Sequence, residues 1–194
     1  MSRDIELQAV AQQVLKPKRY EHVLRVVETS ELLAKRFGAD VEAAKTAAYL
    51  HDIAKHMSDE ELQEILEAGG ENRYLDYHRN IWHAPVGAIL AKQKYQVTDG
   101  DVLAAIKNHC TGRSGMSLVE EVVFLADYME PGRTQPGVEA VRALAETSLQ
   151  KAIWRTLDQT VSYLEASNRV VHPDMLEALA YYREIIGVDE PWKS

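Results

Sequence analysis

The chain has 194 residues, 46% of them hydrophobic and 27% charged, and its 22 basic and 30 acidic residues give a net charge of −8. An acidic chain lacks the basic face that nucleic acid or an anionic membrane needs, so we expect neither as a partner. The single cysteine, the absence of an apolar run near the roughly 20 residues of a membrane span, and a start without a signal-peptide pattern indicate a globular, cytoplasmic protein.

The pattern along the chain predicts an all-α protein. The 10 glycines and 6 prolines lie between long stretches of helix formers. Gly38 and Asp40 mark a helix end and the next helix start, and Ser58 with Glu61 forms a capping box. The predicted helices occupy residues 19–37, 41–56, 59–68, 83–95, 99–109 (opened by Thr98), 117–130, about 137–167 with a break, and 173–186.

The remaining segments are expected to be loops. Residues 71–82 show neither helical nor strand periodicity, no stretch alternates like a strand, and no repeat of fixed period occurs. The turn PGRTQPG at 131–137 is too short and stiff to divide the chain. We therefore predict one helical bundle of about nine or ten helices.

A His-Asp doublet lies inside the most apolar predicted helix. His51 and Asp52 belong to the run YLHDIAKH. A buried, ionised aspartate costs several kcal/mol unless it is paired with a cation or bound to a metal. Lys55, three residues after Asp52, is the local candidate for such a pair. Adjacent helical residues project roughly 100° apart, so both reach one metal only if other helices bring ligands to the same place.

Such ligands occur in four other predicted helices. Each of the four carries one histidine or aspartate, namely His22, His83, His109 and Asp127. Taken singly, a histidine of this kind is usually a core or helix-end residue. Five helices that each present a metal-type ligand are difficult to explain by coincidence, and imidazole with carboxylate ligation suits iron, manganese or zinc.

These residues, in this order, resemble the HD-domain metal-dependent phosphohydrolases. The doublet alone is a weak motif, but the longer string LHDIAK with an upstream histidine and a downstream FLAD is a strong one. Further strings narrow the resemblance to the YqeK-type symmetrical diadenosine tetraphosphate hydrolases, over about residues 15–187. These strings are RYEHVLRV at 19–26, WHAPVGA at 82–88, HCTGRSGMS at 109–117 and FLADYMEPGR at 124–133.

The resemblance implies a single HD-type domain over 1–194 and a defined set of ligands. It implies a primary metal site of His22, His51, Asp52 and Asp127. His83 and His109 would either complete a second metal site or contact the substrate phosphate. Iron is the metal we expect, as one or two divalent or trivalent ions, with manganese or cobalt as alternatives. Cys110 departs from the expected small polar residue, which affects a loop contact and not the chemistry.

Cations near these ligands are candidates for phosphate binding. We expect Lys55, Arg113 and Arg133 to contact phosphate, because each follows a ligand within a turn or a short loop. Thr111 with the following glycine can offer backbone N–H groups to the same oxygens. Lys16 and Lys18 are interpreted as solvated surface charges. Asp52 and Lys55 are the residues expected to act in catalysis.

The resemblance implies cleavage of diadenosine tetraphosphate to two ADP by a metal-bound water. The alternatives are a nucleotidase or phosphodiesterase of the same superfamily, or a catalytically silent nucleotide-binding regulatory module. The complete set of six ligand positions argues against the silent module. A homodimer is compatible with the amphipathic stretch 137–167, which serves equally well as a member of the bundle.

Overall fold

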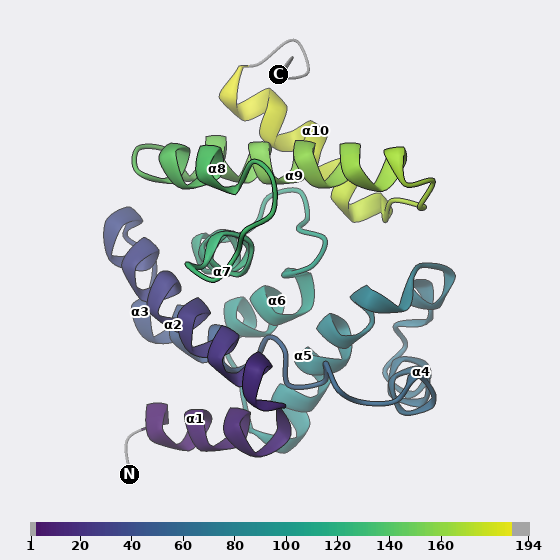
Figure 1. Cartoon of the computed structure of the whole chain (residues 1–194). Coiled ribbons are helices and arrows are strands. Elements are labelled where there is room, and N and C mark those ends of the chain that lie inside the picture. The colour runs from purple at the N-terminus through teal and green to yellow at the C-terminus, as the bar shows by residue number, and fades with distance from the viewer. Residues whose placement is uncertain (1–2, 188–194) are drawn as a thin grey trace.

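The computed structural model describes residues 3–187, and every regular element in that range is helical (Figure 1). The predicted all-α fold is therefore confirmed. Ten α-helices and two short 3-10 helices follow one another along the chain. Their bounds are α1 Arg3–Val14, α2 Pro17–Phe37, α3 Val41–Leu50, α4 Asp59–Ala68, η1 Asn72–Asp76, η2 Arg79–Ile81, α5 His83–Lys94, α6 Gly100–Asn108, α7 Leu118–Met129, α8 Val138–Ala145, α9 Leu149–Ala166 and α10 Pro173–Ile186.

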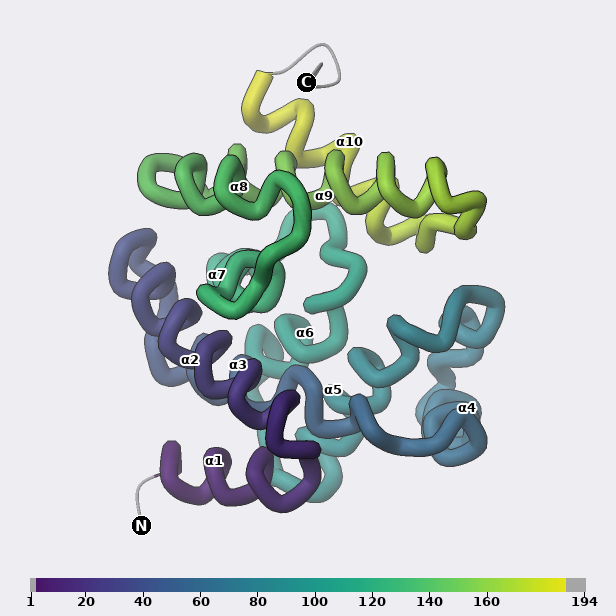
Figure 2. Tube along the Cα trace, in the orientation of Figure 1, coloured from purple at the N-terminus to yellow at the C-terminus, as the bar shows by residue number. Residues whose placement is uncertain are grey.

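The centre of the molecule is formed by α2, α3, α6 and α7, which pack on one another. Helix α5 extends this group through its contact with α6, and α1 closes one end against α2 and α3. Helices α8, α9 and α10 cover the other end, across α7, as the tube view in Figure 2 shows. Within the described residues, no helix is both long and apolar enough to cross a membrane.

Local sequence signals account for most helix ends. Gly38 adopts φ +79°, a left-handed conformation that glycine reaches without strain, and its N–H donates to Ala34 to end α2. Both hydrogen bonds of the predicted capping box are present at Ser58 and Glu61, where α4 begins. The expected break in 137–167 separates α8 from α9.

Two predicted boundaries are wrong, the start of α6 by one residue and the end of α3 by six. Helix α6 is capped by Asp99, whose carboxylate accepts from the N–H groups of the first turn, and not by Thr98. Helix α3 ends at Leu50, whereas a continuous helix to residue 56 was expected. Residues 51–57 form tight turns, with hydrogen bonds such as Lys55 N to Asp52 O at 2.8 Å.

Helix α1 was not predicted. Only Leu7 and Ala11 of this helix are buried, so few apolar residues repeat at the helical spacing. Its position is fixed by tertiary contacts with α2 and α3, which the local sequence does not reveal.

The loop between α6 and α7 is held by a buried carboxylate. Glu120 is 1% exposed and accepts hydrogen bonds from Asn108 Nδ2 at 2.8 Å and Ser117 N at 2.8 Å. Arg113 pairs with both oxygens of the same carboxylate, with Nε at 2.7 Å from Oε1. This network fixes the chain that follows His109.

We expect Arg113→Ala to lower the free energy of unfolding by about 2–3 kcal/mol, because it leaves a buried charge without its cation. Adding Glu120→Gln should recover part of that loss, since the glutamine side chain carries no charge. Chemical denaturation measures both variants. Lys35→Ala, which removes an exposed ion pair with Glu31, is the control, with an expected change below about 0.5 kcal/mol. Unchanged stability in Arg113→Ala would contradict this role.

Candidate metal centre

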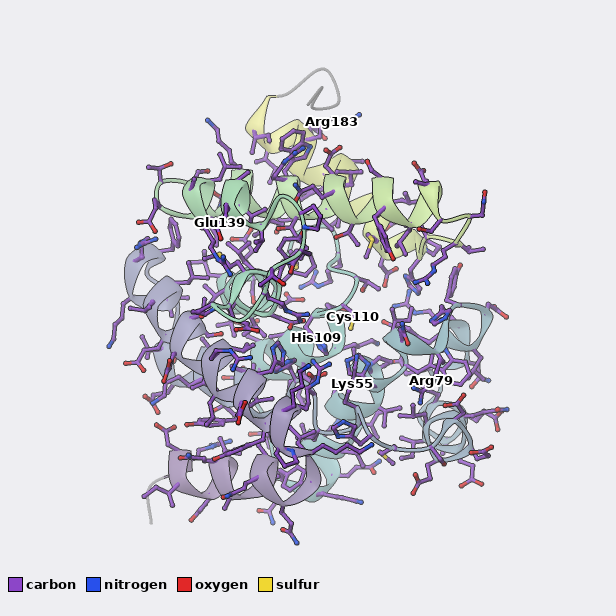
Figure 3. All side chains as sticks on the ribbon, viewed as in Figure 1. Lys55, Arg79, His109, Cys110, Glu139 and Arg183 are labelled. Atoms are coloured by element: carbon purple, nitrogen blue, oxygen red, sulfur yellow. The ribbon has the colours of Figure 1, made fainter. Side chains whose placement is uncertain are left out.

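The six predicted ligand residues lie together in the centre of the fold. His22 comes from α2, His51 and Asp52 from the turn after α3, His83 from the start of α5, His109 from the end of α6 and Asp127 from α7. The five apart from Asp127 are at most 5% exposed. Figure 3 labels His109 and Lys55 in this central region.

One group of donor atoms contains His22, His51, Asp127 and one oxygen of Asp52. The distance from His22 Nε2 to Asp127 Oδ1 is 3.0 Å, and that from His51 Nε2 to Asp52 Oδ2 is 3.3 Å. The two imidazole nitrogens and the Asp127 oxygen lie within 4.8 Å of one another. Such spacing allows one ion to contact all of them at ordinary ligand distances of about 2.0–2.2 Å.

A second group surrounds the other oxygen of Asp52. His83 Nε2 lies 3.1 Å from Asp52 Oδ1 and 3.1 Å from His109 Nε2. Cys110 Sγ lies 3.3 Å from His109 Nε2 and 3.5 Å from His83 Nε2. The carboxylate of Asp52 therefore stands between two donor groups, with one oxygen turned to each.

Hydrogen bonds on the far side of three rings fix which nitrogen faces the centre. His51 Nδ1 donates to Ala48 O and His109 Nδ1 donates to Ile106 O, both at 2.7 Å, and His22 Nδ1 faces Glu130 Oε1 at 3.0 Å. An imidazole whose Nδ1 carries the proton presents the lone pair of Nε2, which is the form that binds metals.

The two Nε2 atoms of His22 and His51 support a metal in the first group. Both are buried and, with the ring proton on Nδ1, each turns a lone pair toward carboxylate oxygens, so neither makes a hydrogen bond. A buried polar atom without a partner costs about 1–3 kcal/mol, and a bound cation removes that cost. Imidazole and carboxylate donors fit iron, manganese, cobalt or zinc.

Electrostatics keep both aspartates ionised. Burial by itself raises the pKa of Asp52, but the neighbouring imidazoles of His51 and His83 outweigh it and hold that pKa well below the usual range. Burial also raises the pKa of Asp127, and His22 and Arg133 are among the groups that bring it well below its ordinary value. Two carboxylates are thus available as anionic ligands.

Lys55 does not pair with Asp52 as its sequence position suggested. Because residues 51–57 form turns, Lys55 Nζ lies 3.4 Å from the ring nitrogens of His83. The cation at Asp52 is Arg19, whose Nη1 lies 2.9 Å from Oδ2. Lys55 still stands at the edge of the second donor group.

Glu130 is a site residue that the sequence analysis missed. It is 1% exposed, orients His22, and binds Arg25, whose Nε lies 2.6 Å from Glu130 Oε2. Its position three residues after Asp127, one helical turn away, was the available signal.

A cleft of about 450 Å³ opens beside the first donor group, and we call it the basic cleft. His22 and Glu130 belong to its wall, and Arg19 and Arg133 reach from it to Asp52 and Asp127. Lys16 and Lys18 are exposed, as expected of solvated surface charges, and they also line the cleft. The lining residues are Lys16, Lys18, Arg19, His22, Arg25, His56, Glu130, Gly132 and Arg133.

The other predicted phosphate ligands differ in how close they lie to the donor groups. Arg133 is at the site, with Nη2 at 2.6 Å from Asp127 Oδ1. The structure does not bring Arg113 into the donor groups, because its guanidinium pairs with Glu120 and faces a separate surface hollow with Lys107. Thr111 is 1% exposed, lies two residues beyond His109, and has a hydroxyl without a hydrogen-bond partner.

Comparison with known proteins gives a consistent result. Residues 19–132 match the HD domain family. The chain is 43% identical over 175 residues to a symmetrical bis(5'-nucleosyl)-tetraphosphatase of Bacillus subtilis, covering 90% of this chain and 94% of that protein. A protein of the same name from Staphylococcus aureus is 38% identical over 178 residues, covering 89% of this chain and 91% of its own.

A solved structure agrees at the level of the fold. The crystal structure of a predicted HD superfamily hydrolase involved in NAD metabolism, from Clostridium acetobutylicum, has a TM-score of 0.89 and 34% identity, and the match covers 95% of this chain and 99% of that one. Because these similarities extend over the helices that carry all six donor residues, the chain belongs to the HD-domain family and, within it, to the group represented by the symmetrical bis(5'-nucleosyl)-tetraphosphatases.

Proposed function

We propose that this protein hydrolyses diadenosine tetraphosphate symmetrically, to two molecules of ADP, in a metal-dependent reaction. The observation that carries the proposal is the direct connection between the donor groups and the basic cleft. Arg19 and Arg133 belong to both, because they bond to Asp52 and Asp127 and also line the cleft. The names of the Bacillus and Staphylococcus relatives support the choice of substrate.

His22, His51, Asp52 and Asp127 would hold the first ion, and Asp52, His83 and His109 would hold a second. When bound, the metal supplies Lewis acidity that makes a water nucleophilic near neutral pH and polarises a phosphoryl oxygen. We propose iron as the resident metal, with manganese or cobalt as replacements, because the donors of the first group are nitrogen and oxygen only.

The residues of the chain provide binding and orientation. The basic cleft has five cationic side chains and one carboxylate, which is the charge that a polyphosphate requires. The guanidinium groups of Arg19 and Arg133 donate hydrogen bonds to phosphate oxygens beside the donor groups. Lys55 supplies a single positive charge next to His83.

The leaving group needs little help from the protein. ADP departs as a stable phosphate anion, so a general acid is not essential. Attack on an inner phosphorus requires two phosphates of the tetraphosphate to lie on each side of the scissile bond. The cleft extends from His22 to Lys16 and Lys18, which is where we place the two phosphates of one departing ADP.

The first prediction concerns the products. Metal-loaded protein in water enriched with oxygen-18 should convert diadenosine tetraphosphate to ADP alone. Half of the ADP molecules should carry one heavy oxygen, because each cleavage adds one water oxygen to one product. Chromatography with mass spectrometry measures both quantities. AMP with ATP would place the cleavage elsewhere, and turnover of simple nucleotides but not of the dinucleotide would indicate a nucleotidase.

The second prediction concerns metal content. Asp52→Ala should lower metal affinity by at least about 100-fold, whereas Glu130→Gln, at a residue that orients His22 and is not itself a predicted ligand, should lower it by about 10–100-fold. Asp158→Asn is the control, because Asp158 is also largely buried but lies in α9 beside Arg155. Elemental analysis after equilibration with a metal buffer measures the metal content of the three variants. Equal metal content in all three proteins would contradict the assignment.

The third prediction concerns the basic cleft. The double variant Lys16→Ala, Lys18→Ala should raise KM for the tetraphosphate about 3–30-fold with little change in kcat, since both lysines are exposed and bind the phosphates as point charges. Steady-state kinetics at low and high salt should show the difference shrinking as salt rises. Lys92→Ala, an exposed lysine of α5 outside the cleft, should behave as the wild type. A double variant with unchanged KM would place the phosphates elsewhere.

A further inference from the structure

A second hollow lies away from the basic cleft, between the segment η1–η2 and the connection from α9 to α10. Its volume is about 90 Å³. Figure 1 shows these two segments facing one another on the same side of the molecule. Most of the exposed wall is apolar, with side chains of Ile81, Leu164 and Met175, and Arg169 also lines it. Val170, at the same hollow, is 73% exposed, so an apolar side chain remains in contact with solvent there.

Two buried polar atoms in this wall have no partner. The hydroxyl of Thr111 and Nε2 of His172 both lack a hydrogen bond, although the two residues are only 1% and 4% exposed. They come from distant parts of the chain, the loop after α6 and the start of α10. Two unpartnered polar groups in one apolar hollow are expected where a ligand completes the hydrogen bonds.

The form and orientation of His172 are fixed. Its Nδ1 accepts from Asp174 N at 3.2 Å, so in the neutral ring Nε2 carries the proton. Burial lowers the pKa of His172, which favours that neutral ring. Tyr74 stacks on it at 5.0 Å between ring centroids and Tyr77 lies at 4.5 Å. The residues that line the hollow therefore include one N–H donor of fixed form and one hydroxyl that can donate or accept.

The hollow is close to the donor groups along the chain. Thr111 follows His109 by two residues, and two peptide links span at most about 7–8 Å between Cα atoms. His109 belongs to the second donor group, which faces Oδ1 of Asp52. Arg19, which lines the basic cleft, contacts Oδ2 of the same carboxylate. This closeness along the chain is the reason for considering the hollow together with the donor groups.

We propose that this hollow is the subsite for a purine base, in which His172 Nε2–H donates to a ring nitrogen and Thr111 Oγ1 meets the adjacent exocyclic group. An adenine edge provides that pair, an acceptor nitrogen beside an amino donor. The apolar wall covers the faces of the ring. The proposal rests on the proposed function in assuming that the ligand is a nucleotide whose phosphates lie at the metal centre.

The test uses binding, so that it does not depend on turnover. ADP, UDP and inorganic pyrophosphate are titrated calorimetrically into the metal-loaded wild type, His172→Asn and Thr111→Val. Asparagine keeps an oxygen to cap α10 and loses the Nε2–H group, and valine has the shape of threonine without the hydroxyl. Circular dichroism checks that each variant is folded.

We expect each variant to bind ADP about 5–20-fold more weakly than the wild type, the loss typical of one hydrogen bond to a buried group. Pyrophosphate affinity should stay unchanged, and the wild-type preference for ADP over UDP should shrink in both variants. Thr160→Val, which removes a hydroxyl in α9 bonded to Thr156 O, is the matched control and should bind all three ligands as the wild type does.

The outcomes separate this inference from the proposed function. Unchanged ADP affinity in both variants, or an equal loss for pyrophosphate, overturns the base subsite even if diadenosine tetraphosphate is cleaved symmetrically. If the tetraphosphate is not cleaved but ADP binding depends on His172 and Thr111 as expected, the subsite stands and the proposed substrate is wrong.

Discussion

The buried carboxylate of Asp52 is the group on which the arrangement of the site depends. Its Oδ2 faces His22, His51 and Arg19, and its Oδ1 faces His83 and His109. An anion at 2% exposure is tolerated only with strong compensation, and here that compensation comes from residues on several helices. The requirement links α2, α5 and α6 to the turn after α3. The same compensation brings together the ligands that a metal needs.

The sequence predicted the helices well, and its errors fall where tertiary contacts outweigh local preference. The region 41–56 has helical composition throughout, yet the chain turns after Leu50. In this turn His51 donates to the carbonyl of Ala48, and both members of the doublet reach the same centre. A regular helix would project the two side chains roughly 100° apart. Periodicity cannot report such a turn, because Ile53 and Ala54 are buried in it just as they would be in a helix.

The site residues divide in the same way. Aspartate and histidine in apolar helices could be identified from sequence, because burial of these groups always demands an explanation. The cations could not be assigned by proximity along the chain. Arg113 follows His109 closely but is held by Glu120, whereas Arg19 reaches Asp52 across 33 positions of sequence. The tertiary structure decides which carboxylate each arginine pairs with, so distance along the sequence does not identify the partner.

Charge is distributed unevenly over this acidic protein, and the distribution has a consequence for substrate orientation. The net charge of −8 would repel a polyphosphate from most of the surface, while the basic cleft attracts it to one place. The other hollow has a mostly apolar wall and a single arginine or lysine side chain, Arg169, against five in the basic cleft. In the binding mode proposed above, the phosphates of a dinucleoside polyphosphate lie at the basic cleft and one of its bases lies at this hollow. The unequal charge of the two places favours that arrangement over its reverse.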